Sequence, residues 1–235
     1  MNKPAVKPSK KSTFVSTDDI LVMLCKSVTD VLASANANQV TYSALVQKIT
    51  KTSLKPDIGS FVLFDGGFSG LVVINFSASA AIEIYQKYMT NMGIPLDELS
   101  SQHTSDDVAN VMGELLNQIL GDFTGLVHKE LQTSITQSQP KMLTINKQLI
   151  ISIDTNLDRP QARRVTFTTQ KGNIFYLEMA MDRTEFIKLH DFVPEEFDPD
   201  DIIRGASIQM EEEKNQDSNK KGPDVDQDLL DELGL

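Results

Sequence analysis

The stretch 60-SFVLFDGGFSGLVVINFSASAAIEIYQKYMTNMG-93 decides the fold. It contains two apolar runs, 60–64 and 70–76, and the Asp-Gly-Gly sequence between them is typical of a hairpin turn. Ser77 follows the second run and predicts the N-cap of a helix, for which the final glycine of the stretch is a stop signal. A hairpin that leads directly into a helix predicts an α+β fold with antiparallel strands.

Two more helices are expected, one on each side of this stretch. A serine–threonine pair at 16–17 can cap the first helix, in which apolar residues recur at helical spacing to about Ala35. A threonine–serine pair at 104–105 can cap the third helix, which runs to about His128 or Leu131. The chain is therefore predicted to have about three helices.

Strands account for the rest of the predicted domain. Residues 39–52 have a mixed, β-like pattern, and residues 142–154 are expected to form a strand. Residues 163–182 contain two apolar runs separated by Lys-Gly-Asn, which predicts a second hairpin. Together these segments predict a mainly antiparallel sheet packed with about three helices.

The composition of the 235-residue chain suits a globular core, because 40% of its residues are hydrophobic and 23% are charged. No apolar run approaches the ~20 residues of a membrane-spanning helix, and no secretory signal is recognisable. The single cysteine, Cys25, lies in an apolar stretch and is expected to be buried. One cysteine and three histidines do not supply a disulfide framework or a zinc cage. We therefore expect a cytoplasmic protein.

The net charge of −11 is concentrated at the C-terminal end. Residues 1–190 hold 18 basic and 18 acidic side chains, whereas residues 191–235 hold 4 basic and 15 acidic ones. A neutral domain with an acidic tail does not favour nucleic-acid binding, which depends on clustered basic groups. An acidic tail favours contact with a basic protein surface.

The third predicted helix has one apolar and one polar side. The apolar side is expected to be buried and consists of Val108, Val111, Met112, Leu115, Leu116, Ile119, Leu120 and Phe123. The opposite side consists of Asp106, Asn110, Glu114, Asn117, Gly121 and Thr124. Glu114 and Asn117 are three residues apart, so their side chains are neighbours.

This polar side is either an ordinary solvated helix face or a contact surface. Gly121 and Gly125 favour a contact surface, because glycine within a helix costs about 1 kcal/mol relative to alanine. An outward-facing glycine also lets another backbone approach closely.

The segment Asn110-Val-Met-Gly-Glu114-Leu-Leu-Asn117, followed by 22 residues and then Pro140, resembles the signature of the CheC/CheX/FliY phosphatases. That signature is Asp or Ser, three residues, Glu, two residues, Asn, 22 residues and Pro. The glycine turn, strand and capped helix of residues 66–89 also resemble CheX, and the resemblance spans roughly residues 17–182. Asn110 departs from the signature, and the motif occurs once, as in CheX, rather than twice as is usual in CheC and FliY.

The resemblance implies a CheC/CheX-like fold and a chemotaxis or two-component phosphatase that hydrolyses the aspartyl phosphate of a CheY-like response regulator. It implies that Asn117 orients the attacking water and that Glu114 pairs with the regulator's active-site lysine. Asn110 and Gly121 are supporting positions on the same face. No cofactor of its own is implied, because the acceptor aspartate and the Mg²⁺ belong to the regulator.

Residues 225–235 regain an amphipathic helical pattern after an acidic, polar linker. The segment resembles the C-terminal regulator-binding peptide of the CheZ phosphatase, which has a different fold. A segment this short is expected to become helical on docking into a groove, and the alternative is a frayed, solubilising tail. The predicted partner-binding residues are Val225, Asp226, Leu229, Leu230 and Leu233.

Four segments are therefore predicted: a disordered basic tail (1–16), a CheX-like phosphatase domain (17–190), an acidic linker (191–224) and a partner-binding helix (225–235). Two alternatives to a phosphatase remain open. The chain is a non-catalytic adaptor that binds a response regulator or a flagellar-switch component, or it is an interaction domain that forms homodimers through its strand edges.

Overall fold

The computed structural model describes residues 14–36, 40–145, 147 and 149–188. The predicted linker 191–224 and the predicted helix 225–235 lie outside the described residues. None of the described helices is both long and apolar enough to cross a membrane.

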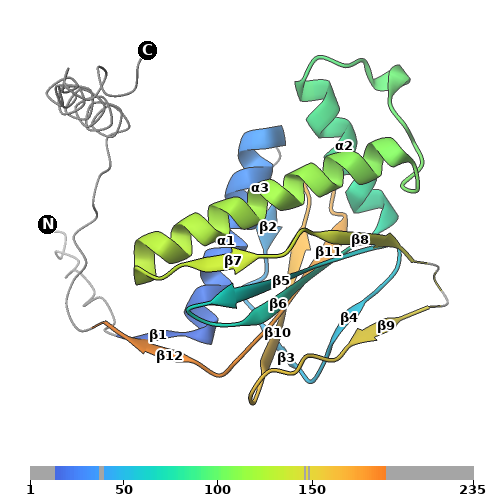
Figure 1. Cartoon of the computed structure of the whole chain (residues 1–235). Helices are drawn as coiled ribbons and strands as arrows, with labels where there is room; N and C mark the ends of the chain where they lie inside the picture. The colour runs from blue at the N-terminus through green and yellow to red at the C-terminus, as the bar shows by residue number, and fades with distance from the viewer. Residues whose placement is uncertain (1–13, 37–39, 146, 148, 189–235) are drawn as a thin grey trace, which may run out of the picture. The chain divides into compact units, whose positions relative to one another are not determined.

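A curled antiparallel sheet forms the centre of the domain (Figure 1). Its strands are β2 (Thr41–Tyr42), β3 (Gln47–Ile49), β5 (Ile58–Gly66), β6 (Gly70–Phe76), β7 (Ile135–Gln137), β8 (Lys141–Thr144), β10 (Gln161–Thr168) and β11 (Ile174–Met181). They follow the order β2-β10-β11-β6-β5-β7, and in addition β3 pairs with β10 and β8 pairs with β5. Both predicted hairpins are confirmed, since β5 pairs with β6 and β10 pairs with β11.

Three helices gather on one side of this sheet (Figure 1). They are α1 (Thr17–Asn36), α2 (Ala78–Asn91) and α3 (Asp106–Leu131), and a single 3₁₀ turn, η1 (Leu96–Glu98), lies between α2 and α3. The predicted caps are in place: the Ser77 hydroxyl accepts a hydrogen bond from the Ala80 N–H, 3.2 Å, and Ser16 and Asp19 bond reciprocally at the start of α1. The α+β prediction is confirmed.

The central strand β6 is buried on both faces, which explains its unbroken apolar sequence. Alternate residues such as Val72 and Ile74 pack in the main core with the helices. The residues between them, Leu71 and Val73, pack in a second, smaller core with Leu54 and others. A row of stacked rings crosses the main core, because Phe175 of β11 lies 4.9 Å from both Phe76 and Phe167; each such pair contributes about 1 kcal/mol.

The prediction of a single strand at 142–154 is wrong. The chain forms β8 and then β9 (Ile151–Ile153), and these two strands have different partners. β8 extends the main sheet beside β5, whereas β9 pairs with β4 (Thr52–Leu54) on the face opposite the helices (Figure 1). An apolar run shows that a segment is buried but not which neighbour buries it, so the pattern did not reveal the break.

The predicted disordered tail also ends earlier than residue 16. Phe14–Ser16 form β1, which pairs antiparallel with β12 (Glu185–Ile187). The half-buried Phe186 packs against the main core, and its ring lies 5.6 Å from that of Phe68. This pairing brings the two ends of the described chain together, while residues 1–13 lie outside it.

Candidate functional site

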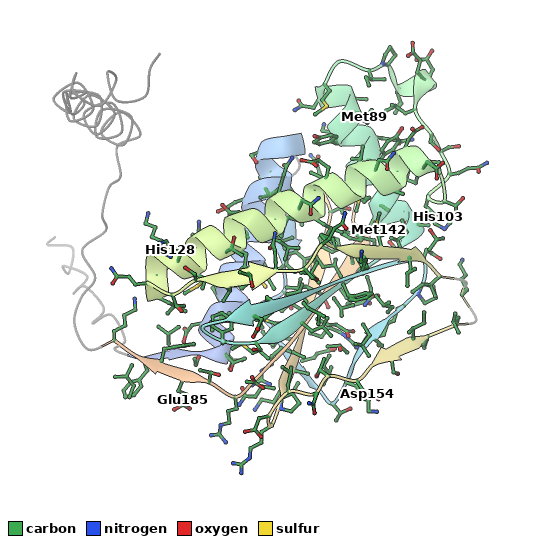
Figure 2. All side chains as sticks on the ribbon, in the orientation of Figure 1. Met89, His103, His128, Met142, Asp154 and Glu185 are labelled. Atoms are coloured by element: carbon green, nitrogen blue, oxygen red, sulfur yellow. The ribbon has the colours of Figure 1, made fainter. Side chains whose placement is uncertain are left out.

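The candidate site lies on α3, whose ends are fixed by local sequence. The Ser105 hydroxyl accepts a hydrogen bond from the Val108 N–H, and two aspartates occupy the first turn. At the other end Gln132 adopts a left-handed conformation, and its N–H donates to the His128 carbonyl oxygen, 2.8 Å. Figure 2 shows His103 and His128 near the two ends of this helix.

The two sides of α3 are divided as the sequence predicts. Seven of the eight residues expected on the apolar side are buried, and the eighth, Val111, is half-buried against the core. On the polar side the exposed residues are Asp106, Asn110, Glu114, Asn117 and Gly121, and Thr124 is half-buried. The four site residues predicted on this helix therefore share one face that is open to solvent.

The Asn117 carboxamide makes no hydrogen bond with any other residue that the structure describes. Its oxygen accepts and its nitrogen donates, so the group can hold a water molecule from both sides without a change of protonation. Asn110, about two helical turns earlier, is likewise exposed. An amide in this state suits positioning rather than acid–base chemistry.

The Glu114 carboxylate accepts one hydrogen bond, from the side-chain amide of Gln118, 2.9 Å away. Within the described part of the chain it has no lysine, arginine or histidine partner within ion-pair distance. A carboxylate held by one neutral donor keeps acceptor positions for an external cation. Gln118 was not among the predicted site residues, although its spacing of four from Glu114 was a signal for this contact.

Three glycines leave parts of the outward surface of α3 without side chains. A Cβ atom added at Gly113, Gly121 or Gly125 has no heavy atom within 4 Å apart from the helix's own neighbouring backbone. The fold itself therefore does not require glycine at these positions. A partner surface can come close to the helix backbone there.

Helix α1 lies beside α3 and carries an exposed ion pair. Lys26 donates a hydrogen bond to Asp30, 2.7 Å away, and this contact raises the pKa of Lys26. Asp122 of α3 raises the pKa of Lys26 further through its charge, so the exposed sides of α1 and α3 adjoin. α1 itself carries no second Glu-x-x-Asn motif.

Other predicted residues lie away from the face or outside the structure. Pro140, the last residue of the signature, is half-buried in the connection between β7 and β8. Cys25 is buried in α1 as expected, and burial raises the pKa of its thiol to about 12. The five residues predicted to bind a partner in 225–235 lie outside the described residues. The described residues contain no cluster of three or more His, Cys, Asp or Glu side chains that could hold a metal.

The sequence matches the model of the family described as "Protein of unknown function (DUF3334)" over residues 11–235. The chain therefore belongs to that family. No curated protein matches the sequence.

Solved structures share its fold. The chemotaxis protein CheX from Desulfovibrio desulfuricans is 17% identical, with a TM-score of 0.58 over 70% of this chain and 99% of that chain. A CheC-like superfamily protein from Shewanella sp. PV-4 is 16% identical, with a TM-score of 0.58 over 72% and 99%. The chemotaxis protein CheX from Vibrio vulnificus is 15% identical, with a TM-score of 0.57 over 70% and 99%.

These likenesses establish the CheC/CheX-like fold that the sequence resemblance implied. At 15–17% identity they concern the fold alone. The predicted membership of the CheC/CheX/FliY family is thus confirmed for the fold, while the sequence itself belongs to DUF3334. The resemblance of residues 225–235 to the CheZ peptide is untested.

Proposed function

We propose that the chain binds a CheY-like response regulator through the exposed face of α3 and hydrolyses its aspartyl phosphate. The observation that carries this proposal is the pair Glu114 and Asn117, exposed on one face of α3 in a domain with the CheC/CheX-like fold. The spacing of these two residues is that of the family signature.

In this mechanism Asn117 acts on the attacking water. Hydrolysis of an acyl phosphate requires the water to lie in line with the bond that breaks. The Asn117 amide accepts one hydrogen bond from the water and donates another, so the water is held in one orientation. The acceptor aspartate and the Mg²⁺ that balances the phosphoryl charge are supplied by the regulator. Alignment of this kind is worth ~10²-fold or more in rate.

Glu114 sets the register of the complex. We assign it an ion pair with the active-site lysine of the regulator, in which the carboxylate accepts a charge-assisted hydrogen bond. Gln118 holds the same carboxylate before the partner binds and either shares it or releases it. Glu114 therefore acts on binding, whereas Asn117 acts on the chemical step.

The test measures the decay of phosphate on purified regulators of the host, with and without the full chain. We expect the wild-type chain to accelerate decay of one regulator, and Asn117→Ala to lose most of that acceleration while still binding. Asn156→Ala is the matched control, because Asn156 is also an exposed asparagine but lies outside α3. Decay that is the same with wild type, with Asn117→Ala and with no added chain contradicts the catalytic proposal.

A non-catalytic adaptor is the second candidate, and Asn110 is the observation that favours it. Asn110 is exposed on the site face where the signature has Asp or Ser, and the chain has a single motif copy. An adaptor binds the regulator and leaves its phosphate lifetime unchanged. A pull-down that retains a regulator whose decay is not accelerated selects this function over the phosphatase.

Residues 225–235 supply a second contact in this proposal. A random coil of about 19 residues spans roughly 25 Å on average, so we expect residues 206–224 of the predicted linker to hold a tethered regulator at about millimolar effective concentration. Deletion of residues 223–235 should raise the half-saturating concentration of regulator and leave the saturated decay rate nearly unchanged, because α3 is untouched. The measurement is the decay rate against regulator concentration, and an unchanged half-saturation point refutes the tether.

A further inference from the structure

A cavity of about 430 Å³ lies between α1 and the edge of the sheet formed by β2 and β3, away from the motif residues of α3. Apolar side chains make most of its wall, among them Leu21, Val22, Val46 and Val165. Cys25 also lines it, and its raised pKa keeps the thiol uncharged, so this part of the wall is apolar too. Ligand-binding cavities typically have this size and lining, with a few polar groups that fix the ligand's orientation.

Two of the polar residues that line this cavity are cationic. Lys48 of β3 and Arg163 of β10 both line it, and they are direct cross-strand partners in the sheet. Side chains directly opposite each other on antiparallel strands point to the same face, and like charges in that position destabilise the pair. Two cations therefore meet at one wall of a largely apolar cavity.

The protein neutralises these cations only in part. Asp18 of α1 accepts a hydrogen bond from the Nε of Arg163, 2.8 Å away, and the Asp18 side chain is 64% exposed. The terminal nitrogens of Arg163 donate to the Ala162 carbonyl oxygen and to Gln161. This leaves one N–H on each terminal nitrogen with no acceptor among the described residues.

Lys48 has no hydrogen-bond or ion-pair partner in the described part of the chain. Arg163 is 8% exposed, so bulk water reaches its guanidinium only in part. A carboxylate placed between Lys48 and Arg163 offsets the two like charges on these cross-strand partners and supplies acceptors to both side chains.

We propose that this cavity binds an amphipathic organic anion, with the apolar chain against α1 and a single carboxylate at Lys48 and Arg163. The apolar wall binds the alkyl chain of the ligand, and Lys48 and Arg163 bind its carboxylate. A neutral or cationic amphiphile of equal length makes the same apolar contacts but forms no ion pair with Lys48 or Arg163.

The direct test is isothermal titration calorimetry of the full chain with decanoate. Decyltrimethylammonium is the matched ligand, because it has the same alkyl chain and the opposite charge. We expect decanoate to bind one site saturably and the cation to bind at least about tenfold more weakly. No saturable binding of decanoate, or equal binding of both ligands, overturns the proposal.

Two matched variants locate the binding. Val22 is 54% exposed at the cavity and Leu63 of β5 is 50% exposed outside it, so an aspartate at either position is compatible with folding. Val22→Asp places a negative charge at the site and should weaken decanoate binding about tenfold or more, whereas Leu63→Asp should leave it unchanged. Lys48→Gln should weaken it about threefold, as expected for a partly exposed ion pair. Equal affinity in Val22→Asp and Leu63→Asp contradicts the assigned site. None of these measurements depends on phosphatase activity.

Discussion

Glu178 is a buried acidic residue whose carboxylate needs several partners inside the domain. Its side chain is fully buried on the face of the sheet opposite the helices, and it pairs with Arg164 at 2.7 Å and Lys55 at 3.3 Å. It also accepts a hydrogen bond from the Ser53 N–H, 2.9 Å. The carboxylate therefore joins β11, β10 and β4. A buried charge is tolerated only when it is paired and hydrogen-bonded in this way.

Glu178→Ala should lower the free energy of unfolding by about 3 kcal/mol, because it leaves two cations and a backbone N–H without their acceptor. Urea denaturation of the full chain measures the change. Asp30→Ala is the matched control, since it breaks the exposed ion pair with Lys26 and should change the free energy of unfolding much less. Similar losses in the two variants are incompatible with a buried, structural role for Glu178.

For single residues, the sequence predicted the exposure of the candidate site but did not predict that Lys48 and Arg163 are cross-strand partners. The exposure of Glu114 and Asn117 follows from a helical period within one segment, so a wheel suffices to predict it. The pairing of Lys48 with Arg163 across two strands depends on which strands pair and in which register. These residues are more than 100 positions apart in the chain, and no local pattern specifies their pairing.

Among the elements, α3 contains glycines that lower helix stability and that packing within the domain does not require. A methyl group at Gly121 or Gly125 has open space, whereas a Cβ at Gly70 of β6 comes within 2.6 Å of the Ala180 carbonyl oxygen. Packing thus requires glycine at position 70 of β6, whereas it does not require glycine at positions 121 and 125 of α3. Close approach of a partner from outside is the explanation that we propose for the glycines of α3.

Gly121→Ala should raise the free energy of unfolding by about 1 kcal/mol, because alanine restricts the unfolded chain and favours the helix. The same variant should weaken regulator binding if the partner packs on this face. Gly70→Ala should instead destabilise the domain. Thermal unfolding and a binding titration measure the two effects, and a Gly121→Ala chain that is more stable and binds equally well argues against a close approach at this position.

Elements with strong local signals were predicted and elements that depend on distant partners were not. Serine caps and apolar periodicity predicted α1, α2 and α3, and glycine turns predicted both hairpins. The two strands within 142–154 were predicted as one, because the apolar run continues while the partner changes from β5 to β4. β1 was assigned to a tail, since a three-residue strand exists only through its pairing with β12.

In the domain as a whole, the sheet separates two hydrophobic cores that join it to different elements. The larger core joins the sheet to the three helices, of which α3 carries the candidate site, and the smaller core joins the sheet to β4 and β9. Asn75 of β6 holds β4 by its backbone: it accepts from the Lys55 N–H at 2.6 Å and donates to the Ser53 carbonyl oxygen at 2.9 Å. The β4–β9 pair is thus attached by side chains rather than by a continuous strand ladder.

This arrangement predicts that the β4–β9 pair opens without disturbing α3. Asn75→Ala removes both bonds to β4, and a buried backbone group left without a partner costs about 1–3 kcal/mol. Hydrogen exchange of the Lys55 amide should therefore accelerate at least about fivefold, while the amides of α3 keep their wild-type rates. Asn156→Ala, at an exposed asparagine, should change neither. Faster exchange along α3 in the Asn75 variant shows instead that the two faces open together, and the site on α3 then depends on the far side of the sheet.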